Sequence, residues 1–77
     1  MKKVRTQAGK YLAKLRVDFD EQQQDMADRL GISNTTLSNI EYGKKTIDQD
    51  EAISIARAYD LTATEQAEFY LAVIGDK

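Results

Sequence analysis

The chain has 77 residues, a net charge of −2 and neither cysteine nor histidine. This length predicts a single domain with a thin core, and the missing residue types exclude disulfides, Cys/His metal sites and serine–histidine or cysteine–histidine catalysis. We therefore expect no enzyme, no metal and no cofactor, because only acid-pair or lysine chemistry remains in a unit with little room for a pocket.

Apolar side chains recur at helical spacing in five segments and predict an all-α fold. The first helix is expected to run from about Gln7 to Asp18, with Thr6 as its N-cap. Asp20 with Gln23 matches a capping pattern and predicts that a second helix opens here. That helix is expected to end at Gly31, whose residue type is typical of a helix stop.

Three more helices follow in the sequence. Ser33 is a natural N-cap for a third helix from Asn34 to about Glu41, and Gly43 lies in the loop after it. Two segments have the capping-box layout, residues 48–51 and 62–65. They predict a fourth helix over the fifties and a fifth helix over residues 63–74.

Residues 23–42 combine the features of a helix, a tight turn and a second helix. Gly31 can adopt a positive φ without a Cβ clash, and the small Ala27 allows two helices to cross closely. Ile32 can fill the corner. Any small helical protein needs such corners, but the whole combination is typical of a helix-turn-helix DNA-binding motif. The stripes that it would bury contain Met26, Leu30, Leu37 and Ile40.

The outward face of the third helix carries short uncharged side chains. If Leu37 and Ile40 are buried, the residues left outside can donate and accept hydrogen bonds at base edges, and Asn34 is the best candidate for adenine. The alternative is an ordinary solvated helix face. The predicted base-contacting residues are Asn34, Thr35, Ser38 and Asn39.

This stretch resembles the Cro/CI-type helix-turn-helix family, also called the XRE family, most clearly over residues 15–43. Its members carry an arginine in helix 1, a glutamine opening helix 2, and a glutamate then a glycine closing the recognition helix. The corresponding residues here are Arg16, Gln23, Glu41 and Gly43. The resemblance implies a compact five-helix lambda-repressor-like domain, an ion pair between Arg16 and Glu41, and a phosphate contact by Gln23.

The sequence departs from the family pattern between the first two helices. Members often have Gly-Leu-Thr before the glutamine, whereas this chain has Asp20, Glu21 and Gln22. The usual apolar residue is therefore missing, and we expect Phe19 to replace it from one turn away.

The charge of the chain is unevenly distributed. Residues 1–16 carry six positive charges and no acid, whereas residues 46–77 carry seven acids. The Debye length at cellular salt is about 8 Å, so acids on a far face are largely screened from DNA. Lys44 and Lys45 are either phosphate contacts or an ordinary exposed loop, and residues 2–5 are either a groove-following arm or a tail without function. The predicted phosphate-contacting residues are Gln23, Thr36, Tyr42, Lys44 and Lys45.

The fifth helix is more apolar than one narrow stripe requires. Either a thin core needs a wide stripe, or the excess surface forms a two-fold interface, which we favour because it would otherwise face water. The predicted interface residues are Phe69, Tyr70, Val73 and Ile74.

These features predict a sequence-specific DNA-binding regulator, most simply a dimeric repressor of an inverted-repeat operator. The alternative is an antitoxin or phage-type accessory protein that uses the same fold to bind a toxin or another protein. The basic start of the chain is followed by no apolar segment. We therefore expect no signal peptide or membrane contact, and a cytoplasmic location in a bacterium or a phage-infected cell.

Overall fold

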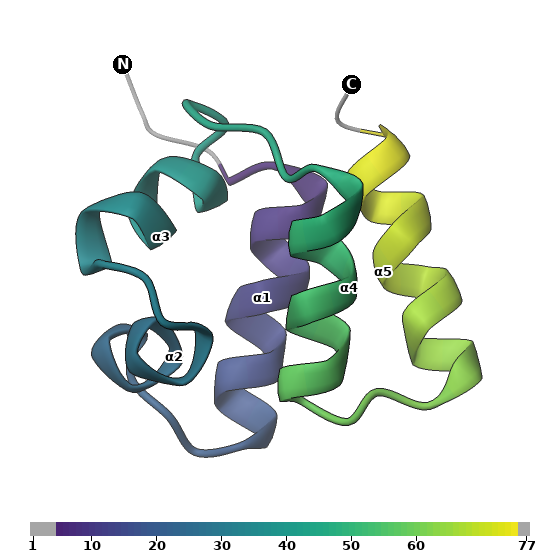
Figure 1. The fold of residues 1–77 in the computed structure, drawn as a ribbon, viewed down its shortest axis with the longest axis horizontal. Helices are drawn as coiled ribbons and strands as arrows, with labels where there is room; N and C mark the ends of the chain where they lie inside the picture. Colours follow the sequence, from purple (N-terminus) through teal and green to yellow (C-terminus); the bar gives the residue numbers. More distant parts are fainter. Residues whose placement is uncertain (1–4, 76–77) are drawn as a thin grey trace.

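The structure, a computed structural model, describes residues 5–75. That part of the chain forms five helices and no strand: α1 (Gln7–Asp18), α2 (Gln23–Leu30), α3 (Asn34–Glu41), α4 (Gln49–Ala58) and α5 (Ala63–Gly75). Helix α1 runs through the middle of the molecule, with α2 and α3 on one side and α4 and α5 on the other (Figure 1). The predicted all-α, five-helix fold is thus confirmed.

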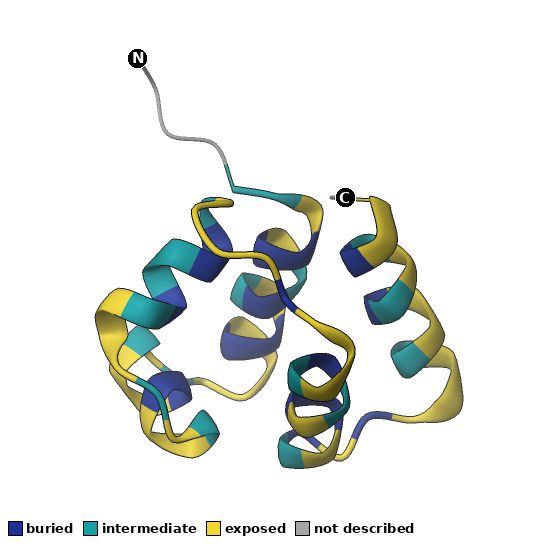
Figure 2. Cartoon of the chain, turned by 45° about the horizontal axis from the view of Figure 1, so that its top comes forward, coloured by how far each residue is buried: buried dark blue, intermediate teal, exposed yellow. Residues whose placement is uncertain are grey.

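One hydrophobic core holds the five helices together. Helix α1 packs against α3 and α5, and α2 packs against α3 and α4. The buried faces of the helices point towards their common centre, whereas their outer faces are exposed (Figure 2). The largest fully buried apolar side chains come from four of the helices: Leu12, Met26, Leu37 and Phe69. Burying a side chain of this size stabilises the fold by about 1.5–3 kcal/mol.

Most of the helices begin with an N-cap residue. Its side chain accepts a hydrogen bond from a backbone N–H of the first turn. Thr6 and Ser33 accept from backbone N–H groups three residues later, at 3.0 and 3.1 Å. Asp48 and Thr62 do the same for α4 and α5. Helix α2 begins differently from the prediction. Its N-cap is Gln22, whose N–H donates to the Asp25 carboxylate at 2.9 Å, and Asp20 is no cap.

The first four helices all end in the same left-handed turn. The residue with positive φ is Asp20 (54°), Gly31 (71°), Gly43 (83°) or Asp60 (48°). The N–H of the next residue donates to a carbonyl five positions earlier, for instance from Glu21 to Arg16 at 2.8 Å. This is the Schellman arrangement, which satisfies helix carbonyls that would otherwise lack a donor. Asp20 therefore terminates α1 instead of opening α2.

In such a turn the residue after the left-handed position often makes an apolar contact. The turns after α1 and α3 depart from this, since the residues there are Glu21 and the exposed Lys44. Leu61 fills that position after α4 and is buried. Glu21 fills it after α1. Its carboxylate accepts hydrogen bonds from Arg29 Nη2 at 2.7 Å and from the Tyr59 hydroxyl at 2.8 Å. A polar contact between α2 and α4 thus takes the place of an apolar one.

Two aromatic rings lie beside the exposed Arg29 side chain at this corner. Its guanidinium carbon lies 4.7 Å from the ring centre of Tyr59 and 5.5 Å from that of Phe19. The two rings meet edge to face at 4.9 Å. We expected Phe19 to replace the missing core residue. It does not, because its side chain packs outside against Tyr59 and remains 44% exposed.

Candidate nucleic-acid interface

Helices α2 and α3 form the corner predicted for residues 23–42. Ala27 is fully buried where the two helices meet, and Gly31 has a φ of 71° at the turn. Ile32 is half-buried and packs against the core. A Cβ on Gly31 would meet nothing within 4 Å, so this position needs glycine for its backbone conformation rather than for space.

The structure places the four predicted base-contacting residues along one helix. Asn34 and Thr35, at the start of α3, are exposed. Ser38 and Asn39 lie one turn further on and are half-buried. Because Leu37 and Ile40 are buried, the position of α3 against the core is set by its apolar side.

Asn34 already has a side-chain partner on α2. Its Nδ2 donates to Gln24 Oε1 at 2.6 Å, and Gln24 Nε2 donates to Asp28 Oδ1 at 2.8 Å. All three residues are exposed. Nothing in the hydrophobic pattern indicates this contact, because all three residues lie outside the buried stripes.

The Glu41 carboxylate, at the last residue of α3, is fully buried between two arginines. Arg16 Nη2 lies 3.2 Å from Oε1, and Arg16 Nη1 donates to Oε2. Arg5 Nε donates to Oε1 at 3.0 Å. The backbone carbonyl of Glu41 also accepts from the Thr6 N–H at 2.9 Å. Helix α3 is thus tied to α1 and to the segment before it.

Arg5 is the part of this cluster that sequence reasoning missed, since it precedes the first periodic helix. Its guanidinium lies against Glu41 and 5.4 Å from the ring centre of Tyr42. Its contacts tie it to the end of α3, although the sequence places it in the predicted arm of residues 2–5. The other basic residues of that arm, Lys2 and Lys3, lie outside the described residues.

A close approach of two helix backbones also went unpredicted. A Cβ added to Gly9 of α1 would overlap the carbonyl and Cα of Glu41. Glycine is therefore needed at this position to let α3 come close to α1.

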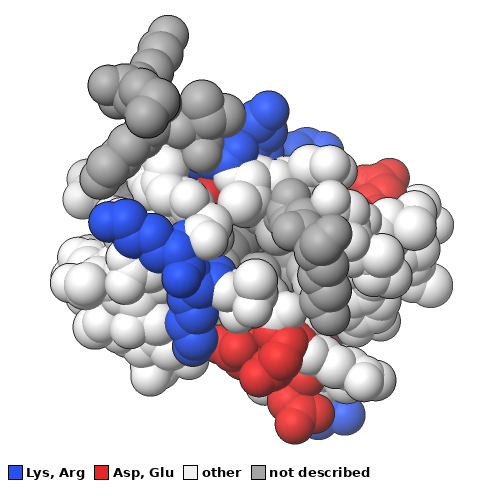
Figure 3. Space-filling view, turned by 90° about the horizontal axis from the view of Figure 1, so that it is seen from above, with Lys and Arg blue, Asp and Glu red and all other residues white. Residues whose placement is uncertain are grey.

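The predicted phosphate-contacting residues lie on and around α3, and they differ in exposure and in hydrogen-bond partners. Gln23 opens α2 and is half-buried, as are Thr36 and Tyr42. Lys44 is exposed. Lys45 donates to Glu51 Oε2 at 2.9 Å and leaves about half of its side chain exposed. Figure 3 shows this end of the molecule, where a band of basic side chains borders a group of acidic ones.

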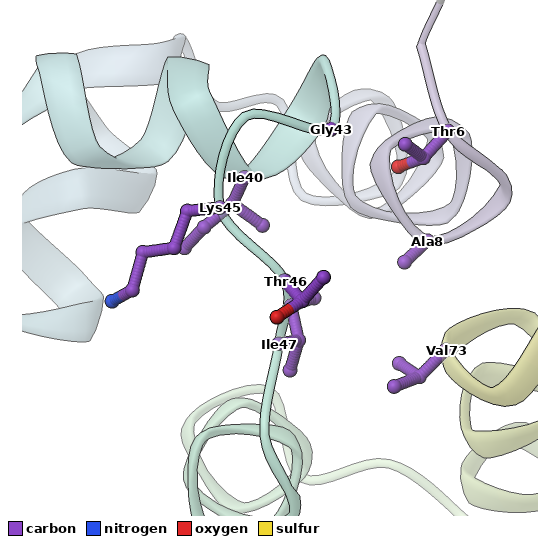
Figure 4. Close-up of a pocket in the computed structure, with 8 residues that line it drawn as sticks. All are labelled: Thr6, Ala8, Ile40, Gly43, Lys45, Thr46, Ile47 and Val73. Carbon is purple, nitrogen blue, oxygen red and sulfur yellow. The ribbon is translucent and has the colours of Figure 1, made fainter. Parts of the chain in front are cut away.

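The loop after α3 covers a small pocket of about 80 Å³. Figure 4 shows apolar side chains of Ala8, Ile40, Ile47 and Val73 around it, whereas Lys45 extends away. This volume holds little more than a few water molecules. Among the described residues no group of His, Cys, Asp and Glu could hold a metal ion. None of the described helices has the length and apolar character that crossing a membrane requires.

The structure divides the four predicted interface residues of α5 between the core and the surface. Phe69 is fully buried, with its ring centre 5.4 Å from that of Tyr11, and Val73 is 8% exposed. Both side chains belong to the core of the single chain, although Val73 also lines a groove between α4 and α5. Tyr70 is half-buried, and Ile74 is 63% exposed.

A model of the helix-turn-helix family matches residues 12–66, which is most of the chain. The chain therefore belongs to the Cro/CI-type (XRE) helix-turn-helix family, as its residue pattern predicted. This is a DNA-binding regulatory family and not an enzyme family. Comparisons with curated proteins and with solved structures gave no match.

Proposed function

We propose that this DNA-binding regulator is a dimeric repressor that inserts α3 into the major groove of an inverted-repeat operator. One observation carries the proposal. The polar side chains of Asn34 and Thr35 project from a helix whose opposite side is fixed by buried Leu37, Ile40 and Glu41. Rigid placement of short hydrogen-bonding side chains is what base recognition in the major groove requires. Such a repressor acts in the cytoplasm of a bacterium or of a phage-infected cell.

Affinity for the DNA backbone comes from residues around both ends of the corner. Lys44 is exposed beside the end of α3, and Lys45 can exchange its carboxylate partner Glu51 for a phosphate. Gln23, Thr36 and Tyr42 add neutral donors to phosphate oxygens. Because few cations are involved, we expect a modest dependence of binding on salt.

The test of base reading is selection of bound sequences from random double-stranded DNA, followed by titration of the selected site. Asn34→Ala should keep the melting temperature, because the side chain is exposed. It should weaken binding to the selected site by about 1–3 kcal/mol and relax the preference at one base pair per half-site. Equal losses on selected and scrambled DNA would show that Asn34 does not read bases.

Dimerisation is proposed through the outer side of α5. A groove of about 430 Å³ lies between α4 and α5, and its lining residues are Gln49, Ala52, Ile53, Tyr70, Val73 and Ile74. Leu71 on the same helix is 68% exposed. A second copy that covers these apolar side chains would place two α3 helices for two half-sites about 34 Å apart.

The oligomeric state tests this arrangement. Ile74→Asp should weaken a dimer seen by sedimentation at micromolar concentration and make operator binding more dependent on concentration. Val17→Asp is the matched control, since Val17 is an exposed apolar residue on α1. If the unmutated protein is a monomer in solution but still protects a two-fold site, dimerisation occurs only on DNA. Co-purification of a second small chain would favour the antitoxin alternative.

A further inference from the structure

Three exposed polar residues form a chain of hydrogen bonds that ends at the proposed base-reading side chain. Asp28 accepts from Gln24 Nε2 at 2.8 Å, and Gln24 Oε1 accepts from Asn34 Nδ2 at 2.6 Å. The first two residues lie on α2 and the third opens α3. The chain therefore crosses the turn of the helix-turn-helix.

The chemistry of these groups gives the chain a direction. An ionised carboxylate only accepts hydrogen bonds, so the amide nitrogen of Gln24 must face Asp28. The carbonyl of Gln24 then faces Asn34, and only the amide nitrogen of Asn34 can donate to it. The Asn34 Oδ1 and the second hydrogen on Nδ2 remain for another partner.

We propose that Asp28 and Gln24 are positioning residues that orient the Asn34 amide and thereby select adenine over guanine at the base pair that Asn34 meets. This inference rests on the proposed function. In the major groove adenine offers the N6 donor and the N7 acceptor, which match the free oxygen and N–H of Asn34. Guanine offers two acceptors, O6 and N7, and one of them would face the Asn34 oxygen.

The three side chains are exposed in the free protein, so water competes for their hydrogen bonds and these add little to stability. In a protein–DNA interface water is partly excluded, and a mismatched acceptor pair is costly there. Substitutions in the chain should therefore change base preference while leaving the melting temperature nearly unchanged. If the three residues had only a structural role, the substitutions would lower the melting temperature and leave the base preference unchanged.

Asp28→Asn is the sharpest variant. An amide at this position can accept or donate, so Gln24 is free to reverse, and Asn34 with it. We expect the ratio of affinities for adenine and guanine sites to fall roughly tenfold. Absolute affinity for both sites should rise because a negative charge is lost near DNA. Both affinities are measured on the same variant, so this general gain affects both and cancels in their ratio.

Asp25→Asn is the matched control, because it removes the same charge from the same helix and leaves the Asp28–Gln24–Asn34 chain intact. Its oxygen can still accept from the Gln22 N–H, as the carboxylate does at 2.9 Å. This variant should bind all sites more tightly and keep the adenine preference of the unmutated protein.

A double-mutant cycle tests whether Gln24 acts through Asn34. Gln24→Ala should relax the preference at the base pair where Asn34→Ala relaxes it, and should add little in the Asn34→Ala background. Additive losses, an unchanged ratio in Asp28→Asn, or a selected guanine at this base pair would each overturn the inference while leaving a sequence-specific binder. A protein without any sequence preference would overturn the proposed function as well.

Discussion

Glu41→Ala should destabilise the protein more than any surface substitution near α3. The Glu41 carboxylate is fully buried and lies against Arg16, which is 9% exposed. Removing the carboxylate strands the Arg16 charge in the interior, and leaves Arg5 without its partner. Breaking a buried ion pair on one side costs roughly 3–5 kcal/mol.

That loss is large against the stability of so small a domain. At the usual stability per residue, 77 residues give a free energy of unfolding of roughly 4–12 kcal/mol. For a domain of this size each kcal/mol shifts the melting temperature by roughly 4–8 °C. Glu41→Ala should therefore lower the melting temperature by at least about 12 °C.

Thermal and urea unfolding followed by circular dichroism measure this effect. Lys45→Ala is the control, because it breaks an exposed ion pair with Glu51 and should cost at most about 1 kcal/mol. Arg16→Met combined with Glu41→Leu should recover much of the loss, since neither charge is then left buried alone. Equal shifts for Glu41→Ala and Lys45→Ala would refute the reasoning.

Three further predictions follow from other contacts. Gly9→Ala should destabilise the fold by about 1–3 kcal/mol in urea unfolding, because the new Cβ would overlap the backbone of Glu41. Lys44→Ala should lower the log–log salt slope of DNA binding by about 1, and an unchanged slope would exclude a phosphate contact. The hydrogen bond from Arg29 lowers the Glu21 pKa below its ordinary 4.5, so its stabilisation is present above that pH and disappears as the carboxylate protonates in acid. Glu21→Gln should accordingly lose less stability than the unmutated protein between pH 6 and pH 3, and parallel curves would contradict this.

Local signals explain why the helices were predictable from the sequence. Caps such as Ser33 and Asp48 act within one turn, and the apolar spacing reports the buried face of each helix. Asp20 misled the prediction because aspartate suits both an N-cap and a left-handed turn, and only its φ of 54° distinguishes the two.

What the sequence could not provide depends on contacts between distant segments. The role of Gly9 exists only because the end of α3 comes against it, and the role of Arg5 only because Glu41 lies there. The wide apolar stripe of α5 was visible, but which part of it is covered depends on the position of α1. Tyr11 packs over Phe69 and leaves Ile74 exposed.

The attachment of α3 through its buried side and at its C-terminal end has a consequence for how this helix fluctuates. With eight residues it is too short to remain helical alone, so its order comes from Leu37 and Ile40 in the core and from Glu41 at its end. Local fraying of α3 would expose the buried carboxylate together with its arginine. Amide hydrogens of its last turn should therefore exchange with solvent only when the whole domain unfolds, whereas those near the exposed Asn34 should exchange through smaller openings.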